Sequence, residues 1–566
     1  FGSSHPVRAS QRRIASVKSA GERANSCAMV APCSAASSKG RGLLALVCLC
    51  SWNPWRVSCD SAASFWYGRS VYFVVTDRFA RGEDDAAASC TGKDWCGGTL
   101  KGLLRRLDYI QGMGFDAIWI TPVVKQVAWR DHWNGTGYHG YWAADFMRID
   151  QHLGTEEDLI ELSRACKMRN MLLMLDVVAN HVGPVDTFEE VVRLAPPFND
   201  PQGQHFHQLG KNAGESFPSY LQHPANAFSS GCFPGNFSCK NYSEELLQEG
   251  WFGDLADIKQ ENEEVRSFLL KWIAHMVNKY ELDGLRLDTA LFMPSWFLKQ
   301  FQEAAGVYII GEVVSHNISF HRSYQESALQ GLLNFPITMQ LGEAFKRSGS
   351  LAEWRRVLER QQEARYPDEH LLGNFVDNHD QDRFLREHGG DVRLLENALV
   401  WVMLHHGLPI VYYGTEQMAV NQHSDNRASM WPHFGRTDLY SLLQRLNWVR
   451  KRYGLAYGGD YTKDHAVAVA ASRDSFVFVR GLLLVAVTNV GDGGSAIGPT
   501  VCLPVASLPS WWGSVCGASG HGPPSSREVL GEGRGAVLRC ERDRVCLQLD
   551  QGHPAVFALS EEIAYV

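Results

Sequence analysis

Eight short apolar segments alternate with helical sequence between residues 71 and 413, and this alternation limits the fold more than any other feature of the chain. The segments at 71–75 (VYFVV) and 117–121 (AIWIT) are apolar on both faces, which is typical of buried parallel strands. The other strands are expected at 171–178, 284–288, 307–312, 332–335, 374–377 and 409–413. Because helical sequence separates them, the pattern predicts an α/β fold, a closed (β/α)8 TIM barrel.

Two regions depart from this alternation. Residues 181–257 follow the third strand and carry Pro, Gly, Asn and a cysteine pair without a strand–helix pattern, so we expect an inserted subdomain there. From residue 456 onward, short alternating runs such as 475–479 are separated by Gly-rich turns, which predicts a C-terminal antiparallel β-sandwich domain. The barrel is therefore expected to comprise residues 64–180 and 258–455, and the C-terminal domain residues 456–566.

The first 63 residues differ in composition from the rest of the chain. The first methionine, Met29, is followed by Lys39 and Arg41, an apolar run at 43–50 and small residues near 58–63. This layout is typical of a secretory signal, and the run of eight apolar residues is too short to span a bilayer. We expect residues 1–63 to be a leader and signal region. The mature protein is expected to be secreted, or to reside in the endomembrane or vacuolar lumen, without membrane association; a transit peptide or disordered tail is the alternative.

Cysteine usage agrees with export. The chain has 14 cysteines and none has the C-x-x-C spacing of a metal site, so disulfides are favoured. N-x-S/T sequons that permit glycosylation occur at Asn134, Asn236, Asn241 and Asn317. The net charge of −8 gives no reason to expect nucleic acid or an anionic membrane as a partner.

The octapeptide 283–290 (DGLRLDTA) combines a turn, a short apolar strand and a charged pair. Arg286 and Asp288 are two residues apart, so a strand points both side chains to the same side. A cation beside a carboxylate lowers the pKa of the acid and keeps it ionised, as a nucleophile requires. Taken alone, the motif is equally compatible with an ordinary ion pair at the end of a strand.

Further polar residues stand where the other expected strands end. They are Asp176, Asn180 and His181 in DVVANH after the third strand, Glu312 at the end of the fifth, and His379 and Asp380 after the seventh. Active sites in such barrels lie at the C-terminal ends of the strands. Three acids, Asp288, Glu312 and Asp380, are therefore expected on one rim, and carboxylates crowded in this way are typical of a catalytic site.

The stretches DVVANH, GLRLDTA, GEVV and FVDNHD resemble the signature regions of the α-amylase family of glycoside hydrolases, most closely those of secreted fungal-type α-amylases. TDRFA at 76–80, GYHGYW at 137–142 and GLPIVYYGTEQ at 407–417 add to the resemblance, which covers about residues 65–450 closely. It implies endo-acting, retaining hydrolysis of α-1,4-glucosidic bonds in starch- or glycogen-type glucans. An α-glucanotransferase with the same three acids is one alternative. A catalytically inactive carbohydrate-binding relative is another, but such relatives lose at least one of the acids.

The resemblance also implies a role for individual residues. Asp288 is the expected nucleophile, Glu312 the acid/base and Asp380 the residue that stabilises the oxocarbenium-like transition state. Retaining hydrolysis needs the first two carboxyl groups about 5–5.5 Å apart. The residues implied to bind the glucan are Tyr141, Trp142, His181, Arg286, His379 and Arg427. A glucan is the expected partner of a protein that we expect to be a monomer.

A structural calcium ion is implied as well, bound by Asn180, Asp257 and the backbone carbonyl of Phe292. Hard oxygen ligands of this kind suit calcium. Glu249 is a candidate for a further acidic ligand, and the alternative for Asp257 is a helix N-cap. Fungal-type enzymes carry a Lys-His pair at the positions of Leu291 and Phe292, on the leaving-group side of the cleft. Since neither residue here offers a side-chain hydrogen bond, weak binding of short glucans on that side is expected.

The resemblance finally implies two disulfides, Cys90–Cys96 after the first strand and Cys232–Cys239 in the insertion. The sequence leaves the pairing of the last four cysteines open; these are Cys502, Cys516, Cys540 and Cys546. Cys166 lies within a helix and is predicted to be a free buried thiol.

Overall fold

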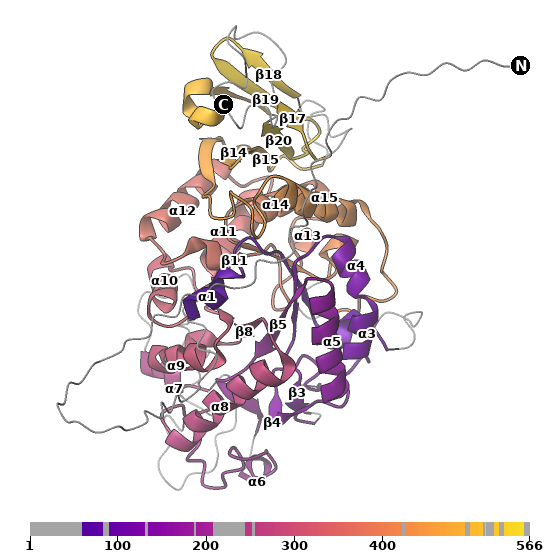
Figure 1. Ribbon diagram of the computed structural model, residues 1–566, viewed down its shortest axis with the longest axis vertical. Coiled ribbons are helices and arrows are strands. Elements are labelled where there is room, and N and C mark those ends of the chain that lie inside the picture. Colours follow the sequence, from indigo (N-terminus) through magenta and orange to yellow (C-terminus); the bar gives the residue numbers. More distant parts are fainter. Residues whose placement is uncertain are drawn as a thin grey trace, which may run out of the picture. The chain divides into compact units, whose positions relative to one another are not determined.

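The computed structural model describes residues 59–82, 90–128, 130, 134–185, 188–207, 244–251, 255–421, 426–492, 499–512, 516, 526–530 and 537–559. The expected signal region up to residue 58, the predicted Cys232–Cys239 bond and the sequons at Asn236 and Asn241 lie outside these residues. The described elements run from helix α1 (Cys59–Ser64) to strand β20 (Ala555–Leu559) (Figure 1).

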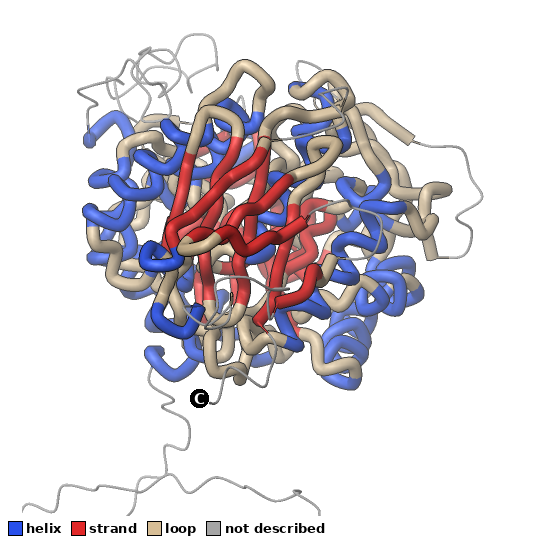
Figure 2. The backbone as a smooth tube through the Cα atoms, turned by 90° about the horizontal axis from the view of Figure 1, so that it is seen from above, coloured by secondary structure: helices blue, strands red, loops and turns tan. Residues whose placement is uncertain are grey.

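Eight parallel strands form a closed barrel, which confirms the predicted (β/α)8 fold. In the order in which they pair, they are β1 (Val71–Val74), β12 (Leu408–Tyr412), β11 (Leu372–Asn374), β10 (Gly331–Leu333), β9 (Tyr308–Gly311), β8 (Gly284–Leu287), β5 (Leu172–Val177) and β2 (Ala117–Ile120). Figure 2 shows strands in the middle of the view with helices on both sides. The strand residues are almost fully buried, as their doubly apolar sequences predict.

The seventh barrel strand differs from its predicted position. It was expected at 374–377, but β11 ends at Asn374. The apolar residues Phe375 and Val376 that suggested a longer strand are buried outside the ladder, at 2% and 8% exposure. The Phe375 carbonyl accepts from the Thr338 hydroxyl instead of from a neighbouring strand. The loop that carries the polar residues therefore begins directly after Asn374, at the rim of the barrel.

Several barrel helices begin at polar residues whose side chains satisfy free N–H groups of the first turn. Thr155 and Asp158 form a reciprocal capping box at α5 (Glu156–Met168), and Asn262 caps α8 (Glu263–Tyr280). The other barrel-side helices are α2 (Thr76–Phe79), α3 (Leu100–Arg105), α4 (Leu107–Gly112), α9 (Ser295–Ala305), α10 (Ile318–Ser327), α11 (Phe335–Phe345), α12 (Leu351–Ala364), α13 (Phe384–Glu387), α14 (Val392–Leu404) and α15 (Asp438–Arg452). Within the described ranges, no helix combines the length and apolar character needed to cross a membrane.

The insertion after β5 begins and ends in one small sheet. Strand β6 (His181–Pro184) pairs antiparallel with β7 (Leu255–Asp257), and His181 lies opposite Asp257. The described part of the insertion also contains α6 (Phe188–Val191) and α7 (Glu244–Glu249). A second small sheet, β3 (Val124–Gln126) with β4 (Ala143–Ile149), follows β2. Both ends of the insertion therefore lie next to the C-terminal end of β5.

The C-terminal part of the chain forms two antiparallel sheets, which confirms the predicted β-sandwich. One sheet contains β13 (Val467–Ala471), β14 (Ser475–Arg480), β15 (Leu483–Thr488), β20 and β17 (Ser526–Glu528); the other contains β16 (Thr500–Pro504), β19 (Arg544–Gln548) and β18 (Val537–Glu541). The two sheets share a hydrophobic cluster that includes Leu484 and Leu547. The disulfides Cys502–Cys546 and Cys516–Cys540 give the pairing that the sequence left open. Cys166 is free and buried, as predicted.

Candidate active site

Three carboxylates lie at the C-terminal ends of the barrel strands. Asp288 directly follows β8, Glu312 directly follows β9, and Asp380 lies in the loop after β11. The parallel ladder places Leu287 opposite Gly311, so Asp288 and Glu312 leave neighbouring strands at the same level. The barrel therefore brings together the three acids that the sequence predicted on one rim.

The guanidinium of Arg286 connects the acids of this rim. Its Nη1 donates to Asp288 Oδ1 at 2.6 Å and to Asp176 Oδ1 at 2.9 Å, and its Nη2 lies 3.0 Å from Glu312 Oε2. Arg286 and Asp176 are each only 1% exposed, so these charges interact with little solvent screening. The ion pair expected between Arg286 and Asp288 is one part of a network that also includes two further acids.

The surroundings of Glu312 favour its protonated form. Burial raises the pKa of Glu312, Arg286 opposes that shift, and the charges of Asp288 and Asp380 raise the pKa further. The backbone N–H of Thr289 donates to Glu312 Oε2 at 2.9 Å and fixes the position of the carboxyl group. A carboxyl group with a raised pKa retains its proton closer to neutral pH, as a general acid must.

Asp380 has more exposed and more cationic surroundings. Its side chain is 41% exposed, Arg427 Nη2 donates to its Oδ1 at 2.6 Å, and His379 Nε2 lies 3.1 Å from its Oδ2. Burial by itself raises the pKa of Asp380, but His379, Arg427 and Arg286 outweigh this effect and lower it. Asp380 is therefore an anion under conditions in which Glu312 is still an acid.

These acids line a cleft of about 690 Å³. Five of the six predicted glucan-binding residues line it too: Tyr141, Trp142, His181, His379 and Arg427. The sixth, Arg286, is buried behind the acids and does not. The Tyr141 hydroxyl donates to Asp176 Oδ2 at 2.8 Å, and its ring stacks on that of His379 with 5.3 Å between centroids. The aromatic ring at the cleft is thus fixed from two directions.

Sequence reasoning missed several residues of the cleft. His139 Nδ1 accepts from the backbone N–H of Tyr141 at 3.1 Å, and burial together with Arg427 lowers the pKa of His139. The others are Lys93, Gly135, Thr136, Tyr138, Leu255, Thr289, Val314, Phe335, Asn378 and Gln381. The position of His139 within GYHGYW was an available signal. Most of the others come from loops, whose sequences carry no periodic pattern.

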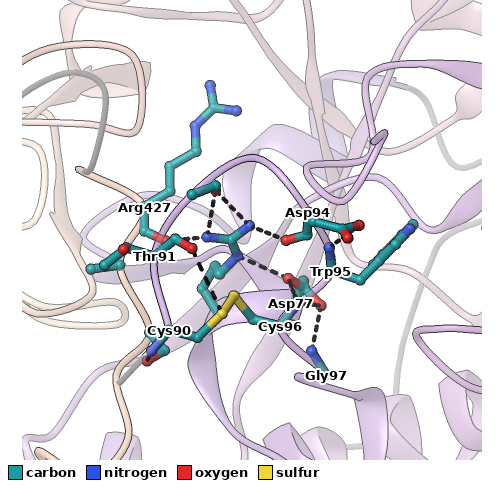
Figure 3. The surroundings of a disulfide bond; sticks show 12 residues. Asp77, Cys90, Thr91, Asp94, Trp95, Cys96, Gly97 and Arg427 are labelled. Carbon is teal, nitrogen blue, oxygen red and sulfur yellow. Dashed lines mark hydrogen bonds and ion pairs between the residues drawn. A yellow bond between two sulfur atoms is a disulfide. The ribbon is translucent and has the colours of Figure 1, made fainter. Parts of the chain in front are cut away.

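The disulfide loop after β1 forms one edge of this cleft through Lys93. Cys90 is bonded to Cys96, as predicted. Figure 3 shows Asp77 beside this disulfide, where its carboxylate accepts from the backbone N–H groups of Cys96 and Gly97 at 2.9 and 3.0 Å. Asp77 is fully buried, so it holds the loop from the protein interior.

Arg78, next to Asp77, ties this loop to the segment that carries Arg427. Its guanidinium donates to the backbone carbonyls of Gly92, Asp94 and Arg427 at 3.1, 2.7 and 3.1 Å. Arg78 is buried and is also paired with Asp77 at 2.8 Å. The TDRFA stretch therefore positions two loops of the cleft, which explains why a buried charged pair follows the first strand.

Two of the predicted calcium ligands meet at the base of the insertion. Asn180 Nδ2 donates to Asp257 Oδ1 at 2.9 Å, and both residues are 1% exposed. Asn180 Oδ1 is buried without a hydrogen-bond partner among the described residues. An orphaned amide oxygen beside a carboxylate matches the donors that calcium takes. His207 Nδ1 lies 2.6 Å from the other Asp257 oxygen, a contact that the sequence did not predict.

The turn η1 (Ala290–Phe292) carries the third predicted ligand, the Phe292 carbonyl, and it contacts α7, which carries Glu249. The side chains of Leu291 and Phe292 are only 1% and 4% exposed, and neither lines the cleft. The expectation that these side chains face the leaving-group side is therefore wrong. Both pack into the hydrophobic core, and the Tyr324 hydroxyl donates to the Leu291 carbonyl at 3.0 Å.

Comparison with known proteins gives a consistent result. A family described as "Alpha amylase, catalytic domain" matches residues 73–438. The chain is 33% identical over 450 residues to Alpha-amylase 2 of Schwanniomyces occidentalis, which covers 77% of this chain and 82% of that protein. It is 32% identical over 448 residues to an alpha-amylase of Saccharomycopsis fibuligera, with coverages of 77% and 84%. A solved alpha-amylase structure from Malbranchea cinnamomea superposes with a TM-score of 0.73 at 30% identity, covering 89% of this chain and 97% of that one.

Proposed function

Because this chain belongs to the α-amylase family of glycoside hydrolases, we propose that it is an endo-acting, retaining hydrolase of α-1,4-glucosidic bonds in starch- or glycogen-type glucans. The observation that carries the proposal is the buried guanidinium of Arg286. Its two terminal nitrogens bind Asp288 and Glu312 beside each other in a cleft that can hold sugar rings. Paired carboxyls with different surroundings are what glycosidic bond cleavage requires.

The first chemical step uses both carboxyl groups. Glu312 donates its proton to the glycosidic oxygen while the bond from that oxygen to the anomeric carbon breaks. The Asp288 carboxylate attacks the same carbon from the opposite side, so a covalent glycosyl ester forms and the shortened glucan leaves as an alcohol. The raised pKa of Glu312 supplies the proton for this step.

In the second step, Glu312 acts as a base. A water molecule gives its proton to the Glu312 carboxylate and attacks the anomeric carbon, the ester bond to Asp288 breaks, and the configuration of the substrate is retained. The anionic Asp380 binds sugar hydroxyls and opposes the positive charge that develops on the ring. Tyr141 offers an aromatic face to that ring, with Trp142 beside it. His181 and His379 are placed to bind its hydroxyl groups.

A bound calcium ion is part of the proposal. Asn180, Asp257 and the carbonyl of Phe292 would hold it, because the orphaned Asn180 Oδ1 and the Asp257 carboxylate supply oxygen donors. A bound ion would link the barrel to the insertion. Asn180 follows a barrel strand and Asp257 closes the insertion, so ligands from both would fix the wall of the cleft near His181.

We also propose secretion, with residues 1–63 as leader and signal, the barrel at 64–180 and 258–455, the insertion at 181–257 and the C-terminal domain at 456–566. Three disulfides among the described residues support an oxidising compartment. The pairing of β6 with β7 supports the limits of the insertion. Asn134 and Asn317 are exposed, which supports their use as glycosylation sites.

The proposal can be tested on maltoheptaose and long-chain amylose. Proton NMR should show that the first products carry the α-anomer. With amylose, the iodine colour should fall well before many reducing ends appear, because internal bonds are cut. Products longer than the substrate would instead identify a transferase. Products of the β-anomer would contradict the roles given to Asp288 and Glu312.

A further inference from the structure

A cluster of histidines around one glutamate lies at the end of the barrel opposite the cleft. Glu369 belongs to the turn η2 (Glu369–Leu371), which precedes β11, and His406 precedes β12, so both lie at the N-terminal ends of barrel strands. His465 comes from the segment before β13. Glu369 Oε2 lies 2.9 Å from His406 Nε2 and 3.8 Å from His465 Nδ1. The three candidate ligand atoms all lie within 4.8 Å of one another.

A fourth side chain adds an independent indication. The ring of His370 lies 4.6 Å from that of His465 and 5.7 Å from that of His406, between centroids. His370 is only 8% exposed, and its Nδ1 is buried without a hydrogen-bond partner among the described residues. A buried imidazole nitrogen left unpaired is costly unless something binds it. The cluster therefore adjoins a further buried imidazole nitrogen that has no partner among the described residues.

We propose that Glu369, His406 and His465 form a zinc-type metal site, with water as a fourth ligand. Two imidazoles and one carboxylate are ligands that Zn²⁺ accepts, whereas calcium prefers oxygen alone. Tetrahedral bonds of about 2.0–2.2 Å place ligand atoms about 3.4 Å apart. The observed 2.9 and 3.8 Å lie on either side of that spacing, so small side-chain rotations suffice.

The tautomer of His406 must change for this ring to bind a metal. The backbone N–H of Ala466 donates to His406 Nδ1 at 3.1 Å, so the proton of the neutral ring is on Nε2, facing Glu369. On binding, the Nε2–H bond breaks and an N–H bond forms at Nδ1, so the ring stays neutral, the hydrogen bond from Ala466 is given up and the freed Nε2 lone pair bonds to the metal.

Charge and access also bear on the site. Arg480 and Lys463 bring positive charge to this region and oppose a cation, while Glu369 compensates one charge. The Arg480 guanidinium donates to the backbone carbonyls of His405 and Thr462 at 2.8 and 3.0 Å, so it is held by other groups. The side chain of His465 is 53% exposed, which gives the ion a path from solvent. A metal here would tie the barrel to the segment that leads into the C-terminal sheets.

The experiment uses the full, untagged mature protein, stripped with a chelator and returned to saturating calcium. Zn²⁺ is then titrated by calorimetry, and Co²⁺ by the visible absorption of its tetrahedral complexes. We expect one tight Zn²⁺ per chain and a rise in Tm. His465→Ala should weaken binding at least about tenfold, since it removes a direct ligand. Because the His465 side chain is exposed, its removal should leave the protein folded, and circular dichroism checks this.

His275→Ala is the matched control, because His275 is an exposed histidine of α8 outside the cluster. It should bind Zn²⁺ like the wild type. Glu369→Gln, which keeps the shape of the side chain, should weaken binding like His465→Ala. Amylolytic activity at low temperature should be the same with and without one equivalent of Zn²⁺. The proposal is overturned if the wild type binds no Zn²⁺, or if His465→Ala and Glu369→Gln both bind it unchanged.

Discussion

The two ends of the barrel surround a buried arginine in opposite ways. At the C-terminal end, Arg286 is held by the carboxylates of Asp176, Asp288 and Glu312. Near the N-terminal end, Arg480 is equally buried at 1% exposure, yet its guanidinium donates only to backbone carbonyls among its described hydrogen bonds. The first arrangement brings opposite charges together, while the second leaves a cation among neutral acceptors and histidines.

This difference shows that burial alone does not determine which chemistry a site supports. Burial raises the pKa of Glu312 and lowers the pKa of His406, so each group is driven toward its neutral form. At the C-terminal end the neutral form carries a transferable proton beside an ionised acid, which suits acid–base catalysis. At the N-terminal end the neutral form carries a lone pair, which suits a metal ion.

The largest effect is expected from removing the nucleophile. Asp288→Asn should reduce kcat by several orders of magnitude and leave the fold intact, because an amide cannot form the glycosyl ester and still fits beside Arg286. Hydrolysis of amylose and circular dichroism measure the two outcomes. Asp108→Asn is the control, since the Asp108 side chain is 78% exposed on the outside of the barrel. If Asp288→Asn keeps more than a few per cent of activity, Asp288 is not the nucleophile.

A large effect on stability is expected just beyond Asp288. Leu291→Lys combined with Phe292→His places polar groups at positions that are 1% and 4% exposed. We expect the free energy of unfolding to fall by roughly 3 kcal/mol or more, because a buried charge without a partner is costly. Met168→Lys, at a position that is 79% exposed, should leave Tm unchanged. A stable double variant with improved hydrolysis of maltotriose would show that these side chains do reach the cleft.

These two positions illustrate what the sequence could and could not predict. The barrel strands were predictable because doubly apolar segments are local patterns, and Asp288 and Glu312 follow their strands directly. The direction of the side chains in η1 depends on packing against α7 and α10, which local sequence does not report. The same limit applies to Asp176 as a partner of Arg286, because the two are brought together by strand pairing across 110 residues.

The histidine cluster shows this limit most clearly. Glu369, His406 and His465 come from three separate segments, each with an unremarkable local sequence. No spacing rule for metal sites joins them, so only the closed barrel and the start of the C-terminal sheets bring them together. Conversely, the cysteine pair Cys90–Cys96 was predictable because its partners are near in sequence, whereas the long-range pairs near the C-terminus were not.

Chelation should have different effects at the two ends of the barrel. Removing calcium should lower both Tm and activity, because the ion proposed at Asn180 and Asp257 fixes the wall of the cleft. An ion present at 100 times its Kd stabilises the folded state by about 2.7 kcal/mol. The Asn180→Ala, Asp257→Ala double variant should already melt lower and respond little to added calcium. Removing zinc should lower Tm without a loss of activity at low temperature. If the chelator changes neither the Tm nor the activity of the wild type, the protein has no such calcium site.

The smallest effect is a shift in the pH dependence of catalysis. Glu312 must be protonated to act as an acid, so kcat/KM should fall as the pH rises through the pKa of Glu312 in the free enzyme. Asp380 is one of the charges that raise that pKa. In Asp380→Asn the pKa of Glu312 should therefore be lower, and the alkaline limb of the remaining activity should move to lower pH by up to about one unit, or about 1.4 kcal/mol.

A control separates this field effect from a general change in charge. Asp382→Asn removes the same charge two residues away, from a carboxylate paired with Arg386 that is not among the groups that raise the pKa of Glu312. It should leave the alkaline limb in place. Loss of the carboxylate at 380 must also lower the rate at every pH, so the position of the limb, and not the maximal rate, is the informative quantity. An unchanged limb in Asp380→Asn, or one moved to higher pH, would mean that burial and Asp288 alone set the proton affinity of Glu312. In that case the C-terminal end would resemble the N-terminal end more closely, with burial as the dominant influence at both.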